Sequence, residues 1–248
     1  MKTTVIIQAR LGSTRLPRKV LMNLGGQSVI GRVIERMQRC QYVDQVVVAT
    51  TDHVIDDAIV DEAARYETTA VRGSEDDVLD RYYQAAIHVE ATEVIRITAD
   101  CPLIDPVLID RLISEFHKRR NAGNPLDYFS NVHPRTFPRG LDAEMFTVDA
   151  LRVAHREAAA TFEREHVTPF FYLNPKRFRM DNFAQAIDQS KLRWTLDETA
   201  DLDFFRAVFR KIPSEQFITT EHVLSLLNEY PEIARLNSHI EQKKLRAA

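Results

Sequence analysis

Cysteine is scarce in this sequence: Cys40 and Cys101 are the only two among 248 residues. Two thiols are too few for a disulfide framework and favour a reducing compartment. Long apolar runs are also missing, since none approaches the roughly 20 residues that span a bilayer. The short apolar run near the N-terminus is interrupted by Gln8 and Arg10, unlike a secretory signal. We therefore expect a cytoplasmic protein with no membrane partner.

An excess of charge of one sign is absent as well. The chain has 33 basic and 36 acidic residues, a net charge of −3 and a pI near 6.3. This balance argues against a general nucleic-acid or membrane-surface binder, although a small anionic ligand needs only a local basic pocket. We expect small-molecule partners and no nucleic acid. With 44% hydrophobic residues, the chain can bury a core in one large domain.

Several common site motifs are missing. The stretch over residues 26–33 has the glycine spacing of a P-loop, but Arg32-Val33 stands where Lys-Ser/Thr is required. No G-x-G-x-x-G follows the first expected strand. No C-x-x-C or H-x-x-x-H spacing supports zinc, and no G-x-S-x-G supports a serine hydrolase. A bound nucleotide would therefore need a different phosphate loop.

The first half of the chain alternates short β-branched runs with amphipathic helical stretches. We expect strands over residues 3–7, 45–50, 70–71 and 93–98, and helices over 28–39, 54–66, 76–89 and 106–119. Four β-α repeats in a row predict an α/β fold with a Rossmann-like, three-layer architecture. The sheet should be open and mostly parallel, with helices on both faces. Ligands bind such sheets beyond the carboxyl ends of the strands.

After about residue 121 the pattern predicts a β-rich excursion from the same domain. The expected strands cover residues 127–130, 142–147, 177–182 and 192–196. The expected helices cover residues 148–159, 162–172, 200–210 and 221–228. We expect a single domain over 1–248, with a β-α half over 1–120, a second half over 121–212 and C-terminal helices over 213–248.

The loop after the first expected strand is the most informative stretch. Four basic residues fall within ten positions of it: Arg10, Arg15, Arg18 and Lys19. Gly12, Ser13 and Thr14 can turn the backbone so that its N–H groups form an anion nest. Arginine forks and a compact lysine charge suit the phosphate oxygens of a nucleoside triphosphate. A solvated basic loop is the alternative, but the position after a buried strand favours phosphate binding.

The stretch over residues 6–21 resembles the N-terminal motif of the cytidylyltransferases that activate acidic sugars, among them the CMP-Kdo and CMP-acylneuraminate synthetases. It is most similar to the branch called spore coat polysaccharide biosynthesis protein F. The resemblance implies a nucleotide-diphospho-sugar transferase-like fold whose loop wraps the triphosphate. The nucleotide contacts that it implies in this loop are Ala9, Arg10, Gly12, Ser13, Arg15 and Lys19.

Two acidic segments supply the expected metal site. Asp100 follows the strand over 93–98, where it either caps a helix or holds a hard cation. The resemblance favours the metal, because the family places a metal-binding aspartate after this strand, followed by Pro-Leu. The family also carries an Asp-x-x-x-Asp-Leu pattern, which matches Asp197 and Asp201. It implies that Asp197 completes a Mg²⁺ site with Asp100, and that Asp201 either binds the metal through water or favours the helix start.

Two further segments lie at the expected ligand edge, after the second and third strands. Contacts to the base or ribose are expected from Thr51, Asp52, Gly73 and Ser74, and Asp100 lies on the same edge. Helix capping by Asp52 and Ser74 is the alternative interpretation. The run over residues 73–82 resembles a Gly-Ser-x-x-Asp-Val-Leu-x-Arg-Tyr stretch of the spore-coat branch. It supports that branch more than it supports any one contact.

The polar segment over residues 131–144 is too long for an ordinary hairpin loop. Its Pro-Arg-Gly-Leu-Asp run and the acidic and basic stretch over 163–169 resemble positions of the same branch. The acceptor contacts implied by these segments are Asn131, Arg139, Asp142, Glu144, Arg164 and His166. A solvated helix face is the alternative for Arg164 and His166. In the Kdo and acylneuraminate relatives the matching region also contributes to a dimer interface, so we expect a homodimer.

Together with the resemblance, the sequence predicts a Mg²⁺-dependent nucleotidyltransferase that uses CTP and an acidic or phosphorylated sugar-like acceptor, in surface polysaccharide biosynthesis. An acceptor oxygen attacks the α-phosphorus and pyrophosphate leaves. The expected catalytic groups are Arg10, Arg15 and Lys19 at the pyrophosphate and Asp100 and Asp197 at the metal. Two alternatives stay open: a sugar-1-phosphate nucleotidyltransferase that uses another NTP, and a non-catalytic nucleotide-binding module.

Overall fold

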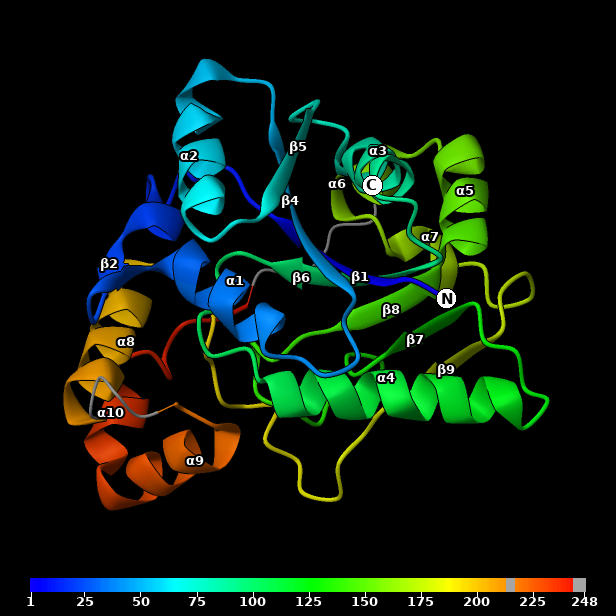
Figure 1. The fold of residues 1–248 in the computed structure, drawn as a ribbon. Coiled ribbons are helices and arrows are strands. Elements are labelled where there is room, and N and C mark those ends of the chain that lie inside the picture. Colours follow the sequence, from blue (N-terminus) through cyan, green and yellow to red (C-terminus); the bar gives the residue numbers. More distant parts are fainter. Residues whose placement is uncertain (213–216, 243–248) are drawn as a thin grey trace.

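A seven-stranded sheet forms the centre of the computed structural model, which describes residues 1–212 and 217–242 (Figure 1). Its strands lie in the order β5 (Thr69–Gly73), β4 (Gln45–Thr51), β1 (Thr3–Gln8), β6 (Glu93–Thr98), β8 (Glu144–Thr147), β7 (Tyr128–Ser130) and β9 (Met180–Asn182). Within this sheet β8 runs antiparallel to its neighbours, and the other strands share one direction. The mostly parallel α/β fold expected from the sequence is therefore confirmed.

Helices cover both faces of the sheet because successive strand residues point to opposite sides. In β1, Val5 and Ile7 pack toward one face and Ile6 toward the other, and all three are fully buried. The first face carries α1 (Val29–Gln38), α2 (Asp57–Arg65), α4 (Pro106–Asn121), α8 (Thr199–Lys211), α9 (Thr220–Glu229) and α10 (Pro231–Arg235). The second face carries α3 (Val78–His88), α5 (Val148–Glu157), α6 (Thr161–His166) and α7 (Pro169–Tyr172). Burial on both sides explains why the central strands are continuously apolar.

The chain order places β1 at a switch point of the sheet. After β1 the chain adds β4 and β5 on one side, and it then crosses back to add β6 on the other side. The connections that leave the carboxyl ends of β1 and β6 therefore diverge, which is where open α/β sheets bind ligands. The basic loop over residues 9–18 and the segment that contains Asp100 both start at this point.

Several expected elements differ in the structure. Residues 192–196 form no strand, and a bridge between Arg139 and Arg193 is their one sheet pairing among the described residues. The helix expected over 162–172 is divided into α6 and α7 at Val167, whose φ is 71°. The helix expected over 54–66 begins with a 3₁₀ turn, η2 (Val54–Asp56).

A short hairpin of β2 (Asn23–Leu24) and β3 (Gln27–Ser28) was not expected from the sequence. Two-residue strands are too short to show an alternating pattern, so periodicity cannot detect them. The hairpin precedes α1 and lies beside α8, in the layer that covers the first face of the sheet. It therefore adds to that layer and leaves the order of the main sheet unchanged.

The C-terminal part of the described chain forms α9 and α10, which pack against α8. Of the C-terminal helices expected over 213–248, these two lie within residues 217–242, and residues 213–216 and 243–248 lie outside the described residues. No helix in the two described ranges is long and apolar enough to cross a membrane.

Candidate active site

The loop over residues 9–18 connects β1 to η1 (Lys19–Leu21) at the carboxyl edge of the sheet. The N–H of Leu11 donates to Asp56 Oδ1 at 2.8 Å, and this bond anchors the loop to the start of α2. Among the described residues, the backbone N–H groups of Gly12, Thr14 and Arg15 donate to no protein acceptor. The loop thus offers free donors to an anion, as a phosphate nest does.

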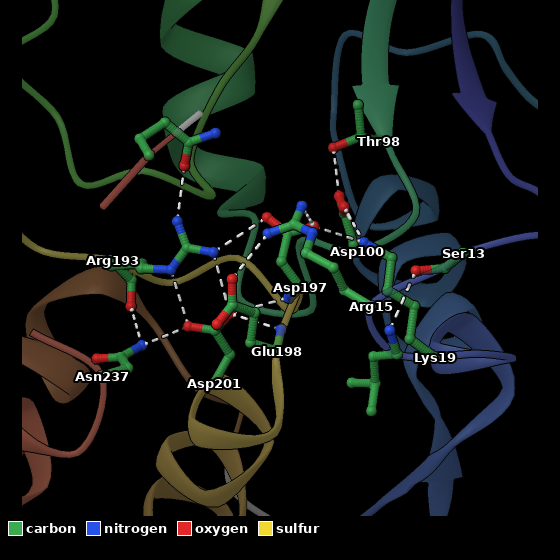
Figure 2. Close-up of polar contacts among 12 residues, drawn as sticks. Ser13, Arg15, Lys19, Thr98, Asp100, Arg193, Asp197, Glu198, Asp201 and Asn237 are labelled. Atoms are coloured by element: carbon green, nitrogen blue, oxygen red, sulfur yellow. Dashed lines mark hydrogen bonds and ion pairs between the residues drawn. The ribbon is translucent and has the colours of Figure 1, made fainter. Parts of the chain in front are cut away.

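Lys19 joins the two aspartates that the sequence places at the metal. Its Nζ lies 2.7 Å from Asp100 Oδ2 and 2.8 Å from Asp197 Oδ1 (Figure 2). Asp100 follows β6 and Asp197 precedes α8, so distant parts of the chain meet at one ammonium group. Two carboxylates that share an ammonium mark a position where a small cation is favoured. In the structure Lys19 occupies this shared cation position.

Burial and pairing shift the pKa values of this cluster in opposite ways. Burial lowers the pKa of Lys19, but the charges of Asp100 and Asp197 outweigh burial and raise it above the ordinary value. Burial raises the pKa of Asp100, but Lys19 and a hydrogen bond from Thr98 Oγ1 at 2.7 Å outweigh burial and lower it. Lys19 and Asp100 are therefore both charged at neutral pH.

Backbone contacts hold the two aspartate segments together. The N–H of Leu196 donates to the carbonyl oxygen of Asp100 at 2.9 Å. Gly140 lies against the same stretch, with a φ of 100°, and an added Cβ would lie 2.0 Å from Trp194 O. Only glycine fits this approach, so the loop over 131–143 is locked against residues 193–196.

Of the other two predicted phosphate-binding cations, Arg15 contacts the shared cation position and Arg10 pairs with Glu75. Arg15 lies 3.2 Å from Asp197 Oδ1 and 3.1 Å from Glu198 Oε1, and a third of its side chain (33%) is exposed. Arg10 is more exposed and lies 3.1 Å from Glu75 Oε1. Arg10, Arg15 and Lys19 are thus each paired with carboxylates, and the phosphates of a bound triphosphate would compete with those carboxylates for the three cations.

Asp201 lies behind Asp197, on the side away from the shared cation position (Figure 2). Its side chain is fully buried, and its oxygens accept hydrogen bonds from Arg193, from Asn237 and from two backbone N–H groups just before α8. The structure therefore does not bring Asp201 to the cation position that the other two predicted ligands share. Arg193 and Asn237 were not among the predicted site residues.

The expected base contacts surround the ends of β4 and β5. Thr51 is buried and its Oγ1 donates to Asp56, while the N–H of Asp52 donates to Gly73 O at 2.9 Å. Ser74 Oγ accepts from a backbone N–H just before α3 at 3.3 Å. These contacts hold this edge of the sheet in place, but neither Asp52 nor Ser74 caps a helix, since Asp77 is the N-cap of α3 and Asp56 is the N-cap of α2.

Arg81, in α3, faces the same edge and was missed by the sequence reasoning. Its side chain packs against Gly73, and the residue is 2% exposed. Its Nε and Nη1 have no hydrogen-bond partner in the described part of the chain, and burial lowers its pKa. Leaving these two buried nitrogens without hydrogen-bond partners is costly. Sequence spacing alone could not separate this arginine from one on a solvated helix face.

Several of the expected acceptor contacts are already used within the protein. Asn131 braces its own loop, because its amide donates to Leu141 O at 2.7 Å and accepts from the N–H of Ala143 at 2.9 Å. Asp142 forms a bidentate ion pair with Arg135. Both side chains therefore shape the loop over 131–143.

Two other expected acceptor contacts, Glu144 and Arg164, form ion pairs on the face of the sheet that carries α3. Glu144 is buried and accepts from Arg96 Nη1 at 2.7 Å and from Tyr128 Oη at 2.6 Å. Arg164 Nε donates to Asp77 at 2.9 Å, which ties α6 to the start of α3. These contacts account for both residues without a ligand.

Arg139 and His166 keep side chains that bind no other group of the described chain. Arg139 is half-buried, and burial together with the nearby charge of Arg135 lowers its pKa. His166 is half-buried too, and burial lowers its pKa, so it is neutral at pH 7. A half-buried guanidinium with no partner suits an anionic group of a ligand.

The structure has hollows at two places near these elements. A cavity of about 220 Å³, lined in part by Tyr128, His133 and Tyr172, opens near the carboxyl ends of β7 and β9. A larger one of about 580 Å³ lies between the β2–β3 hairpin and α2, and none of the predicted site residues line it. Position in the fold therefore favours the sheet edge, rather than the larger hollow, as the site of chemistry.

The donor set of the shared cation position fits Mg²⁺. In the part of the chain that the structure describes, no group of three or more His, Cys, Asp or Glu side chains could hold a metal ion. Mg²⁺ does not need such a group, because it keeps several waters and takes one or two carboxylates plus substrate phosphates. Asp100 and Asp197 supply those two carboxylates.

Comparison with known sequences identifies related proteins over nearly the whole chain. A family model described as cytidylyltransferase matches residues 4–245. Uncharacterized protein MJ1063 of Methanocaldococcus jannaschii is 34% identical over 99% of this chain and 98% of its own length. Spore coat polysaccharide biosynthesis protein SpsF of Bacillus subtilis is 30% identical over 92% of this chain and 95% of its own length.

Solved structures agree with the sequence comparison. A cytidylyltransferase from Leptospira borgpetersenii superposes with a TM-score of 0.89 at 31% identity, over 98% of this chain and 100% of its own. CMP:2-keto-3-deoxy-manno-octonic acid synthetase, solved in complex with CTP, superposes with a TM-score of 0.64 at 21% identity, over 85% and 99% of the two chains. The second similarity is in fold alone.

Proposed function

The chain belongs to the cytidylyltransferase family of nucleotidyltransferases, and from that premise we propose that it transfers CMP from CTP to an acidic, sugar-like acceptor and releases pyrophosphate. One observation carries the proposal: the Lys19 ammonium lies within 2.8 Å of both Asp100 and Asp197, beside a loop with free backbone donors. The name of the Bacillus subtilis relative refers to polysaccharide biosynthesis, and we propose a role in surface polysaccharide assembly for this chain.

The phosphate loop would hold the triphosphate during the reaction. Free N–H groups at Gly12, Thr14 and Arg15 can donate to phosphate oxygens. An acceptor oxygen displaces pyrophosphate in line at the α-phosphorus, and the cations Arg15 and Lys19, with Arg10 at the rim, neutralise the charge that develops on the leaving group. Catalysis would thus come from positioning and charge neutralisation, with no dedicated side-chain base.

Asp100 and Asp197 would hold Mg²⁺ once Lys19 turns to the phosphates. When bound, Mg²⁺ neutralises phosphate oxygens and lowers the pKa of an attacking hydroxyl. Asp197 presents Oδ1 to the cleft, because its Oδ2 is held 3.0 Å from Arg193 Nη2. Asp100 presents Oδ2, because Thr98 donates to its Oδ1. Each aspartate therefore has one oxygen available to the metal.

Arg139 would bind the carboxylate or phosphate of the acceptor. It lies in the loop that Gly140 locks against residues 193–196, next to the segment that carries Asp197. Its guanidinium has no partner within the described residues, and an acceptor anion would supply one. The neutral His166 and the cavity beside Tyr172 would take uncharged parts of the acceptor.

Pyrophosphate release tests this function. Wild-type protein with Mg²⁺ is incubated with each of CTP, UTP, GTP and ATP, together with sugar acids and sugar phosphates. We expect release with CTP and a sugar acid, and none with Asp100→Asn. The matched control is Asp110→Asn, which lies in α4 and accepts backbone N–H groups at Gln41 and Tyr42.

The outcomes separate the alternatives. Release with a sugar phosphate and another NTP would replace CTP and the acid by the substrates of a sugar-1-phosphate nucleotidyltransferase. Tight CTP binding without release, independent of Mg²⁺, would indicate a non-catalytic nucleotide-binding module. Full activity of Asp100→Asn would contradict the metal role of that residue.

We also propose a homodimer and a cytoplasmic location. The dimer is supported by the resemblance of the 131–169 region to that of dimeric relatives. Cys40 and Cys101 are buried and unpaired, which suits a reducing compartment. Light scattering coupled to size-exclusion chromatography checks the first point, and the mass of a single chain would contradict it.

A further inference from the structure

Arg193 is the central residue of a buried network behind Asp197 (Figure 2). Its Nε and Nη2 donate to the two oxygens of Asp201 at 2.8 and 3.0 Å, and Nη2 also lies 3.0 Å from Asp197 Oδ2. Only 5% of the Arg193 side chain is exposed. A rigid guanidinium fork that contacts two carboxylates fixes their relative orientation, which a flexible lysine does not.

Asn237, in the segment after α10, closes the network from the opposite side. Its Nδ2 donates to Asp201 Oδ1 and to the carbonyl oxygen of Arg193, each at 2.9 Å. Further along the same segment, Gln242 Oε1 accepts from Arg193 Nη1 at 2.6 Å. Asn237 is 2% exposed, so water cannot replace these bonds. The segment after α10 therefore holds the arginine that holds Asp197.

The backbone of Asp197 is fixed by the same network. Asp201 Oδ2 accepts from the N–H groups of Asp197 and Glu198 at 2.9 and 3.0 Å. Burial raises the pKa of Asp201, but its bonds to Arg193, to the N–H of Asp197 and to Asn237 outweigh burial and lower it, so it is charged. Both the main chain and Oδ2 of Asp197 are thus held in place, and its Oδ1 alone faces the cleft.

We propose that Arg193, Asp201 and Asn237 position Asp197 as a ligand with a single free oxygen, and that the segment after α10 thereby sets the divalent-cation affinity of the site. The proposal rests on the proposed function only for the presence of a divalent cation beside the nucleotide. Residues that orient a metal ligand change metal affinity by about 10- to 100-fold when they are removed. Asn237 acts through Arg193 and Asp201, so we expect about a tenfold effect from it.

Mn²⁺ binding tests the proposal without turnover. Free Mn²⁺ is measured by electron paramagnetic resonance during titration of the protein saturated with α,β-methylene CTP, which cannot release pyrophosphate. The Asn237→Ala variant should bind Mn²⁺ about tenfold more weakly than wild type. Its affinity for the analogue without divalent cation should be unchanged. The matched control Asn174→Ala removes a bond to Phe170 O of 2.7 Å outside the network, and it should bind Mn²⁺ as wild type does.

Gln242→Ala covers the case in which Asn237→Ala does not fold. Gln242 is exposed, and its loss removes one partner of Arg193, for which we expect about threefold weaker Mn²⁺ binding. A folded Asn237→Ala protein, or failing that Gln242→Ala, with wild-type Mn²⁺ affinity overturns the proposal. A lower unfolding temperature with unchanged Mn²⁺ affinity means a structural role only, and also overturns it.

The two proposals fail in different ways. The proposed function fails if wild-type protein binds no Mn²⁺ in the presence of the α,β-methylene analogues of CTP, UTP, GTP and ATP, each tested in turn. If wild type binds Mn²⁺ and Asn237→Ala binds it equally well, the proposed function stands and the positioning role of Asn237 fails.

Discussion

Replacing Lys19 by methionine should destabilise the free protein and make its stability depend on Mg²⁺. Methionine keeps most of the stem but removes the ammonium that lies 2.7 Å from Asp100 and 2.8 Å from Asp197. The Lys19 and Asp197 side chains are each 12% exposed. Breaking a buried ion pair by removing one partner costs about 3–5 kcal/mol. Because Arg15 remains 3.2 Å from Asp197, we expect the lower end, about 3 kcal/mol of unfolding free energy in chelator.

Mg²⁺ should recover part of this loss, because the position between the two carboxylates is then open to a divalent cation. A ligand at about ten times its dissociation constant stabilises the folded state by about 1.4 kcal/mol. The assay is urea unfolding in chelator and in Mg²⁺, with Lys118→Met as the control, since 76% of that side chain is exposed. A Lys19→Met protein as stable as wild type in chelator, with no added response to Mg²⁺, would refute the shared cation position.

Three further changes test other parts of the site. Arg139→Met should raise KM for the acceptor by about 10- to 100-fold and leave KM for CTP unchanged in initial-rate kinetics, whereas an equal rise in both would place Arg139 outside the acceptor site. The pKa of Asp201 is lowered in the folded state, so its stabilising contribution is complete above the ordinary carboxyl pKa of about 3.9 and is lost as pH falls through the folded value. Urea unfolding of Asp201→Asn should therefore depend less on pH between about 2 and 4 than that of wild type, and an equal dependence would contradict the pairing with Arg193. Gly140→Ala should lower the unfolding free energy by about 3 kcal/mol, because its Cβ would lie 2.0 Å from Trp194 O, and a loss below about 1 kcal/mol would mean that the loop can shift.

The sheet and one half of the site could be predicted from local sequence. The apolar runs of the first half, over residues 3–7, 45–50 and 93–98, formed strands, because β-branched residues suit a sheet that is covered on both faces. The parallel order then places the segments after β1 and β6 at one edge, which is why Lys19 and Asp100 meet. Asp197 was singled out by the resemblance to the family's Asp-x-x-x-Asp-Leu pattern, and its contact with Lys19 joins residues 178 positions apart.

Tertiary contacts decided what the pattern could not. The alternation of Leu192, Trp194 and Leu196 predicts a strand, and Trp194 and Leu196 are indeed buried, but this stretch packs against a loop and forms one bridge in place of a ladder. The role of Asn237 depends on a contact 36 residues away in sequence, for which no local signal exists.

Several polar side chains that were predicted to bind a ligand instead form hydrogen bonds or ion pairs with other groups of the protein. Asp142 and Asn131 brace a loop, and Arg164 joins two helices. Residue type and spacing cannot distinguish a side chain that binds a ligand from one that binds the protein, because both need the same chemistry. Arg139 stands out only when the partners of its neighbours are known.

A crystal structure with Mn²⁺ and α,β-methylene CTP tests the central claim most directly. The account predicts an anomalous Mn²⁺ peak bound by Asp100 Oδ2 and Asp197 Oδ1, with Lys19 and Arg15 turned to phosphate oxygens and Asp201 still paired with Arg193. A nucleotide bound with Lys19 still between the two aspartates, and with the metal elsewhere, would contradict it.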